Sequence, residues 1–415
     1  MNGSYKSRGV WWTGWFIACT ILMISIPGSA GPGEGLKMGN ATISPFVDLS
    51  ATYDSNVKLK ETEEEDDFFI DLMAGGAGLY QKGTLDVSMR LWYMFRNYFE
   101  ITDYSHNEWG EKVVIRYGDR EDIQWILNQK YRLTEDIDRS PSSSDFGNTE
   151  SQQLILSEDR TMRVARRLHD IGVSAGRNLT DKTDLDLGYS FSDNNYVATN
   201  LNDWTENKIL AEVAYKVSDK SWMLLNGQYG VHDSASLVES PELYILRLGV
   251  QTKNTDNLML KSTAGMEHYT YTTTDNGYVV HDYDSFSFDV SGDWKMTEKV
   301  KFQLTARNGV QPTAEYDNNV MDIALASLSA EYQIREAWIF SLTGSYRYDQ
   351  YREKEVLDGV LQELNSRQLA GHVRLNYDPP LRFYKAYIEV RYEDTDSTWT
   401  YYEQLRVTLG LSLRY

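Results

Sequence analysis

The sequence predicts an all-β fold, a transmembrane antiparallel up-and-down β-barrel of about 18 strands. Three observations predict it. Apolar and polar residues alternate along most of the chain after Thr42, the connections between these stretches are short and long in turn, and the chain ends inside an alternating stretch. Side chains of a strand point alternately to opposite faces, so each stretch indicates a strand with one apolar and one polar face.

The composition fits such a barrel and excludes several other classes. Hydrophobic residues make up 41% of the 415 residues and the mean hydropathy is -0.51, which is too polar for a bundle of membrane helices. The 29 tyrosines suit strands with one apolar face. The formal net charge of -20 argues against a nucleic-acid partner, because phosphate binding needs a basic surface.

Residues 1–30 have the features of a secretory signal peptide. Lys6 and Arg8 precede the apolar run "VWWTGWFIACTILMISI", and small residues follow at Ser29 and Ala30. An uncleaved anchor and a lipid attachment at Cys19 are the alternatives. Cleavage would remove the only cysteine, which excludes disulfides and cysteine-based zinc sites from the mature chain. We expect a signal peptide at 1–30, a short N-terminal segment at 31–41 and the barrel at 42–415.

The alternating stretches have the length of membrane-spanning strands. In "TDLDLGYSFSDNNY", from Thr183 to Tyr196, Leu185 and Leu187 lie on one face and Asp186 on the other. Many stretches reach the roughly 9 to 11 residues that a tilted strand needs to cross a bilayer. Helical spacing of apolar residues occurs at 353–366, where we expect at most a short helix within a loop.

The connections predict the orientation of the barrel. Short turns follow every second strand, and they are "QKGT", "YGDRED", "LTDKT", "SDKS", "NTDN", "MTEK", "IREA" and "DPPLR". The other connections are longer and polar. Short periplasmic turns and long extracellular loops are typical of outer-membrane barrels. An exported soluble β-sandwich array or β-solenoid is the alternative.

The C-terminal "LRVTLGLSLRY" predicts the strand that closes the barrel. Backbone groups in hydrocarbon must all be paired, so this strand needs a partner, and the first strand near "ISPFVDLSATY" is the natural one. The predicted assembly signal consists of outward apolar residues and the terminal ring: Leu409, Leu411, Leu413 and Tyr415.

Two stretches resemble a known family. "LSATYDSNVKL", from Leu49 to Leu59, and "LTDKTDLDLGYSF", from Leu179 to Phe191, resemble the first hairpin and a periplasmic turn of putative β-barrel porin 2 type outer-membrane proteins. The resemblance implies an outer-membrane conduit for export of a polysaccharide. The final "VTLGLSLRY" is similar to the signal read by the barrel-assembly machinery, which more often ends in Phe.

The polar faces are predicted to line an aqueous lumen, because a dry core could not hold so many charges. Two interpretations stay open: the charges solvate the wall, or an excess of basic groups favours anions. The predicted lumen-lining residues are Arg90, Arg96, Arg116, Lys130, Arg132, Arg247, Arg307, Arg347, Arg374, Arg391 and Arg406.

Three loops carry further hypotheses. The longest, 136–165, is either a surface loop or a plug folded into the lumen. The acidic stretches 61–67 and 281–284 are either solvated surface or places where divalent cations bridge to lipopolysaccharide.

No motif for catalysis, a cofactor or a metal is present, so an enzyme is not expected. Export of an extracellular polysaccharide is the first functional hypothesis. A diffusion porin for small solutes, anions being one class of them, and a structural or adhesive barrel with a filled lumen are the alternatives. Expected partners are outer-membrane lipid and lipopolysaccharide, the barrel-assembly machinery and periplasmic polysaccharide-export proteins, in the outer membrane of a Gram-negative bacterium.

Replacement of the terminal ring tests the assembly signal. Tyr415→Ser should reduce the amount of assembled barrel more than it reduces the activity of barrels that do assemble, because it removes an interfacial anchor and part of the signal. Heat-modifiable mobility in gels measures assembly. Normal assembly of this variant would contradict the interpretation.

Overall fold

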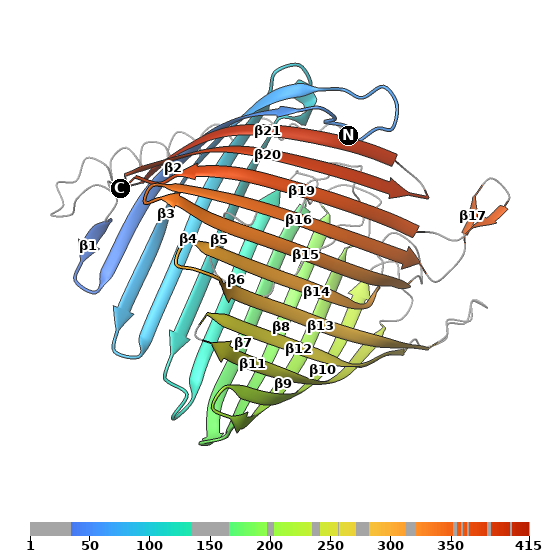
Figure 1. Ribbon diagram of the computed structural model, residues 1–415. Helices are drawn as coiled ribbons and strands as arrows, with labels where there is room; N and C mark the ends of the chain where they lie inside the picture. The colour runs from blue at the N-terminus through green and yellow to red at the C-terminus, as the bar shows by residue number, and fades with distance from the viewer. Residues whose placement is uncertain are drawn as a thin grey trace.

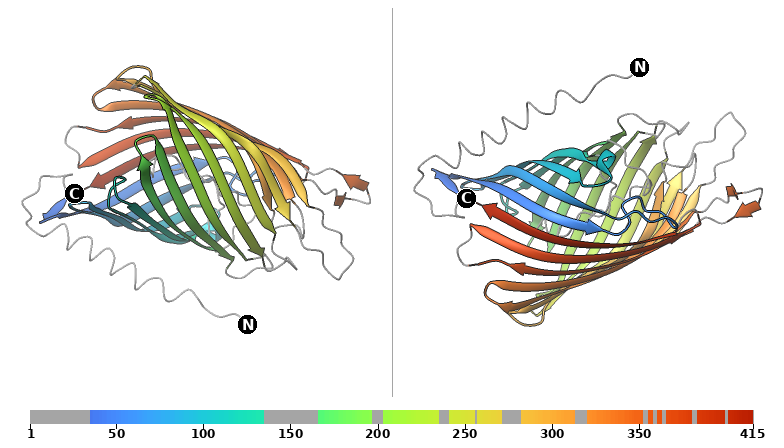
Figure 2. Two further views of the ribbon diagram at one scale, coloured as in Figure 1. Left: turned by 90° about the horizontal axis from the view of Figure 1, so that it is seen from below. Right: turned by 90° about the horizontal axis from the view of Figure 1, so that it is seen from above.

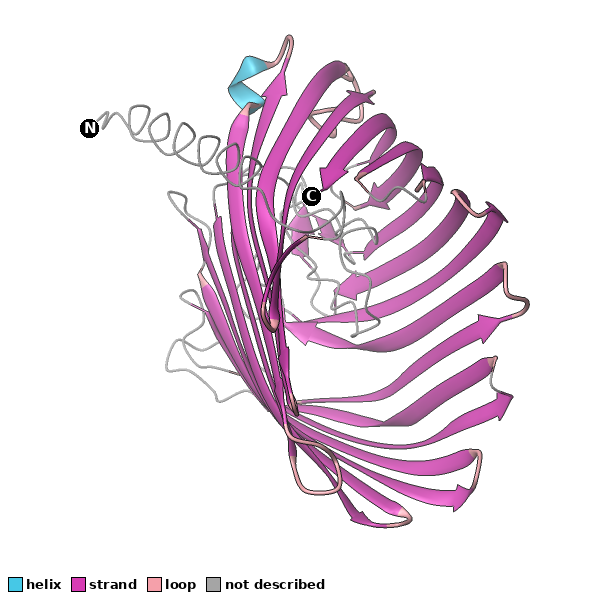
Figure 3. Ribbon diagram, turned by 90° about the vertical axis from the view of Figure 1, so that its left-hand side faces the viewer, coloured by secondary structure: helices cyan, strands magenta, loops and turns pink. Residues whose placement is uncertain are grey.

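The computed structural model describes residues 35–134, 166–196, 203–234, 241–255, 257–270, 282–312, 320–351, 355–357, 360–362, 365–379, 383–398 and 401–414. Strands make up almost all of these residues, and the short helix η2 (Thr102–Tyr104) lies at the end of the barrel that carries the long loops (Figure 3). Within the described residues, no helix has the length and apolar character needed to cross a membrane. The predicted signal peptide lies outside them.

Eighteen long antiparallel strands form one closed barrel (Figure 1). They are β2 (Ala41–Asp54), β3 (Asp67–Lys82), β4 (Leu85–Tyr98), β5 (His106–Tyr117), β6 (Gln124–Thr134), β7 (Arg166–Thr180), β8 (Thr183–Tyr196), β9 (Trp204–Ser218), β10 (Ser221–Ser234), β11 (Glu242–Thr255), β12 (Leu258–Thr270), β13 (Tyr283–Lys295), β14 (Val300–Pro312), β15 (Val320–Arg335), β16 (Trp338–Tyr351), β19 (Asn365–Tyr377), β20 (Tyr384–Ser397) and β21 (Tyr401–Arg414). A three-residue strand, β1 (Leu36–Met38), pairs with the start of β2.

The predicted closure is confirmed. The last strand pairs with the first long strand over nine residues, from Phe46 opposite Arg414 to Asp54 opposite Arg406. In Figure 2 the red β21 therefore lies beside the blue β2. The eight predicted short turns all connect strands at one end of the barrel, the end where β2 begins and β21 finishes. The long connections lie at the other end, which is the extracellular end by the usual rule for outer-membrane barrels.

The helix expected at 353–366 is wrong. The segment contains a two-stranded hairpin, β17 (Glu355–Leu357) and β18 (Val360–Gln362), which projects from the extracellular end (Figure 1). The residues between the two strands are Asp358 and Gly359, a dipeptide that strongly favours two-residue hairpin turns. This turn signal, together with β-branched Val356 and Val360, outweighs the helical spacing of the apolar residues.

Near the extracellular end, β14 separates from its neighbour β13 and lies against the inner surface of β12. The ladder between β13 and β14 ends at Phe288 opposite Asn308, although both strands continue toward the extracellular end. Beyond this point the backbone of Val310 contacts side chains of β12 instead. Its N–H donates to Glu267 at 2.8 Å, and its carbonyl accepts from the Tyr269 hydroxyl at 2.5 Å. The tip of β14 is therefore held against the inner surface of the wall.

A buried charge reinforces the closing ladder at its extracellular end. Asp54 is fully buried and accepts from Arg406 Nε at 2.9 Å and from Gln404 Nε2 at 2.5 Å. The next residues continue the contact, because Ser55 N–H donates to the carbonyl of Leu405 and the Ser55 hydroxyl accepts from Leu405 N–H. These side-chain contacts extend the seam beyond the last paired residues.

The seam predicts unequal effects of two arginine substitutions. Arg406→Met leaves the buried Asp54 carboxylate without its charged partner, which should lower the free energy of unfolding by about 3 kcal/mol. Arg367→Met removes a pair with Asp396 whose side chains are 55% and 53% exposed, and should cost less than about 1 kcal/mol. Urea unfolding in lipid vesicles measures both. Equal losses would contradict the role of the seam.

Candidate functional site

The two faces of each strand have different chemistry. Along β21, Leu409, Leu411 and Leu413 are exposed on the outer surface, whereas Gln404 and Ser412 point inward and are buried. The alternation continues around the barrel, and the exposed large apolar side chains form the belt that faces lipid. The three leucines of the predicted assembly signal lie in this belt. Tyr415 lies outside the described residues.

The lumen contains a cavity of about 830 Å³. Residues of β2–β6, β13–β16 and β19–β21 line it, so it follows more than half of the wall. Its lining includes eleven basic side chains, which are Arg90, Arg96, Lys130, Arg132, Lys295, Lys301, Arg374, Lys385, Arg391, Arg406 and Arg414. It includes seven acidic side chains, which are Asp48, Asp71, Glu108, Asp293, Glu331, Asp378 and Glu389. Basic groups exceed acidic groups by four.

The structure brings seven of the eleven predicted lumen residues together in this cavity: Arg90, Arg96, Lys130, Arg132, Arg374, Arg391 and Arg406. The strand registers place the other four on inward-facing positions outside it. Arg247 pairs with Glu267 and donates to Ser287, and Arg347 pairs with Asp349 at 2.6 Å. Arg307 lies opposite Asp289, and Arg116 lies opposite Asp86. A role of these residues in conduction stays a prediction.

Ion pairs hold several of the cavity's basic groups in place. Arg96 makes two hydrogen bonds to Asp71, at 2.7 and 2.9 Å. Arg132 makes two to Glu108, both at 2.8 Å, and Glu108 also accepts from Thr134. Two parallel bonds fix the plane of a guanidinium group. The positive groups are therefore positioned on the wall before any solute arrives.

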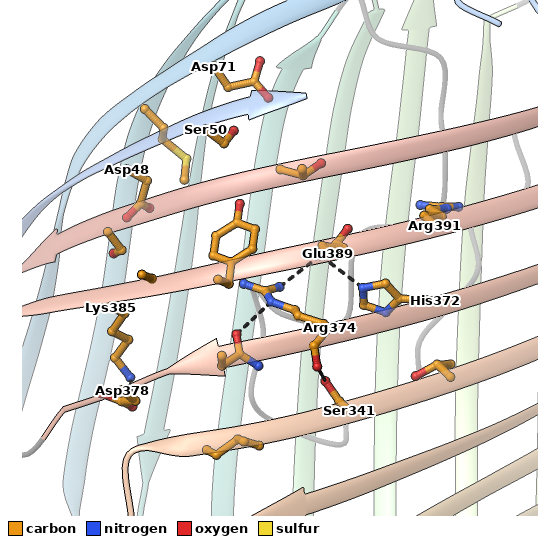
Figure 4. Close-up of a pocket in the computed structure, with 18 of the residues that line it drawn as sticks. Asp48, Ser50, Asp71, Ser341, His372, Arg374, Asp378, Lys385, Glu389 and Arg391 are labelled. Atoms are coloured by element: carbon orange, nitrogen blue, oxygen red, sulfur yellow. Dashed lines mark hydrogen bonds and ion pairs between the residues drawn. The ribbon is translucent and has the colours of Figure 1, made fainter. Parts of the chain in front are cut away.

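A second cluster lies on β19 and β20 (Figure 4). Arg374 Nη1 and His372 Nε2 approach the same carboxylate, Glu389, at 3.4 and 3.1 Å. Arg374 Nε also donates to Asn376 at 2.8 Å, and its guanidinium carbon lies 3.9 Å from the centre of the Tyr387 ring. The Tyr387 ring beneath this guanidinium group and the oxygen atoms of Asn376 and Glu389 beside it fix its position on the wall and its orientation.

The loop between β2 and β3, residues 55–66, folds against the inner wall at the extracellular mouth. Val57 is fully buried against the inward-facing rings of Phe69 and Tyr98, and Leu59 is buried against Tyr402. Leu59 has a φ of 54°, in the left-handed region that costs a residue with a side chain about 1–2 kcal/mol. Packing of these two apolar side chains therefore holds the loop in a strained shape against the inner wall.

Ion pairs connect the first half of the same loop to its second half. Glu65 accepts from Lys60 at 3.1 Å and pairs with Lys58 at 2.6 Å. Hydrogen bonds from Lys58 and Lys60 lower the pKa of the Glu65 carboxyl, and the hydrogen bond to Glu65 raises the pKa of the Lys58 ammonium. A lowered carboxyl pKa means that this contact contributes at neutral pH and is lost as the pH falls through that pKa. Glu65 belongs to the acidic stretch 61–67, which is thus partly neutralised within the loop.

The sequence-based candidate for an infolded loop, 136–165, lies outside the described residues, as does His281 of the second acidic stretch, so infolding of 136–165 stays a prediction. The signal that could have identified loop 55–66 is the pair Val57 and Leu59 within an otherwise polar connection. No group of three or more potential metal ligands is found among the residues that the structure describes. Cation bridging by the acidic stretches stays a prediction.

The chain is similar to several solved structures and matches one family model. Solved structures that it is similar to include the outer membrane protein OpdK from Pseudomonas aeruginosa (TM-score 0.47, 11% identity, covering 90% of this chain and 99% of that one). They also include OccK2 (OpdF) from the same organism (TM-score 0.46, 11% identity, covering 92% of this chain and 100% of that one). A third is OccAB3 from Acinetobacter baumannii (TM-score 0.46, 11% identity, covering 91% of this chain and 100% of that one). No curated protein matches. The family model described as putative beta-barrel porin 2 matches residues 31–415.

The inward loop predicts a change in conductance. Leu59→Asp places a charge against Tyr402 and should release loop 55–66, because an unpaired charge is costly in an apolar contact. Single-channel conductance in planar bilayers should rise. Glu64→Gln, at an exposed position of the same loop, should leave the conductance unchanged. A Leu59→Asp channel with wild-type conductance would show that the loop does not limit flow.

Proposed function

The chain belongs to the putative beta-barrel porin 2 family, and we propose that it is a diffusion pore for small anionic solutes in the outer membrane. The protein is an outer-membrane β-barrel porin of a Gram-negative cell, a channel rather than an enzyme. The observation that carries the finer proposal is the cavity lining, in which eleven basic groups stand against seven acidic ones. Asp54 and Glu393 pair with Arg406 and Arg391 from just outside the lining, and with these two counted the basic groups still exceed the acidic ones by two.

One feature of the lumen supports a small solute. Loop 55–66 folds inward at the extracellular mouth, where buried Val57 and Leu59 anchor it to the inner wall. A loop packed inside the mouth is better suited to the passage of single small molecules than to that of a polysaccharide chain. Diffusion of small solutes is therefore the stronger hypothesis, and polysaccharide export the weaker one.

The charge arrangement supports selection of anions. Guanidinium groups fixed on a wall of low dielectric constant create a local positive potential that raises the concentration of anions in the lumen. The overall charge of -20 does not oppose this, since much of it lies on loops and is screened by salt beyond about 8–10 Å. Lipid and lipopolysaccharide around the outer belt, and the barrel-assembly machinery during insertion, are the partners that we propose.

Reversal potentials test the proposal. In planar bilayers with a tenfold gradient of KCl, the wild-type pore should prefer chloride over potassium. Substitution of two cavity arginines, Arg90→Gln and Arg374→Gln together, should lower the chloride-to-potassium permeability ratio several-fold, because both positive groups leave the wall. Arg367→Gln is the matched control on the outer surface and should leave the ratio unchanged. Cation preference in the wild-type pore would overturn the proposal.

A further inference from the structure

Three aromatic residues on the inner wall each lie directly opposite a glycine. Phe46 pairs with Gly75 across β2 and β3, Trp92 with Gly110 across β4 and β5, and Tyr387 with Gly410 across β20 and β21. The ring of each lies over its glycine. A Cβ atom built on Gly75, Gly110 or Gly410 would come within 2.6, 2.2 and 2.2 Å of a ring atom, respectively. No other residue fits beneath these rings.

Two of the rings support an arginine. The guanidinium carbon of Arg374 lies 3.9 Å from the centre of the Tyr387 ring, and that of Arg90 lies 4.7 Å from the centre of the Phe46 ring. A guanidinium group over an aromatic face is stabilised electrostatically and loses rotational freedom. The result is a stack of glycine, ring and guanidinium that presents a flat, fixed arginine to the cavity, and both arginines line that cavity.

The two stacks follow each other along the wall. Gly410 of the first lies opposite Ser50 on β2, four residues from Phe46 of the second. At roughly 3.3 Å per residue along a strand and roughly 4.8 Å between strands, the two rings are about 16 Å apart. A solute that leaves one arginine can therefore reach the next within the same cavity.

We propose that Arg374 and Arg90, each held flat by its ring, are the specificity-determining residues of the pore and select solutes that carry a carboxylate. This inference rests on the proposed function as an anion pore. A guanidinium group matches the planar fork of a carboxylate with two parallel hydrogen bonds, which a spherical halide cannot make. Glu389, 3.4 Å from Arg374, disfavours a doubly charged phosphate more than a singly charged carboxylate.

The experiment measures how solutes interrupt the chloride current through single channels in planar bilayers. The probes are galacturonate, glucose as its neutral counterpart and inorganic phosphate. Galacturonate should interrupt the wild-type current at a concentration at least tenfold lower than glucose or phosphate. Equal potency of galacturonate and glucose, or stronger block by phosphate, would overturn the assignment to carboxylates.

Variants separate the shape of the arginine from its charge. Arg374→Lys keeps the positive charge but loses the fork and the stack, so the concentration of galacturonate for half block should rise about tenfold. Tyr387→Leu keeps an apolar side chain over Gly410 but removes the flat support for Arg374. It should therefore also raise the concentration of galacturonate for half block. Tyr387→Phe keeps the ring and should behave like the wild type.

Arg367→Lys is the matched control. Arg367 lies on the same strand as Arg374 but at an exposed, outward-facing position outside the cavity lining, so its replacement by lysine should change the block by less than twofold. Equal effects of Arg367→Lys and Arg374→Lys would overturn the role of the stacks. All lysine variants should keep the chloride preference. If the wild-type channel prefers chloride but Tyr387→Leu does not change the block by galacturonate, this inference alone is refuted. If the wild-type channel does not prefer chloride, the proposed function is refuted.

Discussion

Pairing of backbone groups in hydrocarbon is the constraint on which the rest of the structure depends. A strand edge that faces lipid would leave N–H and C=O groups unpaired, so the sheet must close on itself. Closure here joins residues that are about 350 positions apart, as the Asp54–Arg406 and Asp54–Gln404 contacts show. The buried Asp54 carboxylate requires both partners, and it thereby specifies the register between β2 and β21.

Closure converts a simple alternation into two separate environments. Outward residues contact lipid, while inward residues share a wet interior that can hold charges. Because the eighteen strands enclose more space than their side chains fill, loops and strand tips can fold inward without a clash. Loop 55–66 and the tip of β14 both do so, and each uses a specific contact: Val57 against Phe69 and Tyr98, and Glu267 against the backbone of Val310. These two segments occupy space inside the barrel that the strand number alone would leave open.

The sequence predicts what depends on local periodicity. Strand faces, the eight short turns and the partner of the last strand follow from alternation, turn residues and the need for closure. The apolar residues Val57 and Leu59 mark loop 55–66 in the sequence, but their partners Tyr98 and Tyr402 are distant along the chain, so no local pattern reveals where the loop packs. The hairpin at 355–362 was missed because two helical turns and two short strands have similar apolar spacing. The pairs of aromatic residues and glycines require the exact register between strands, which only the structure provides.

These pairs link the stability of the wall to its selectivity. A glycine in a strand weakens the sheet, and a ring laid across it restores the lost contact. On the lumen side the same ring also supports an arginine, as at Tyr387 and Arg374. Replacement of Gly410 by a larger residue would therefore displace the ring and, with it, the guanidinium group, although Gly410 itself touches no solute. Under the proposed role of the stacks, a change in any of the three residues alters the wall and the solute preference together.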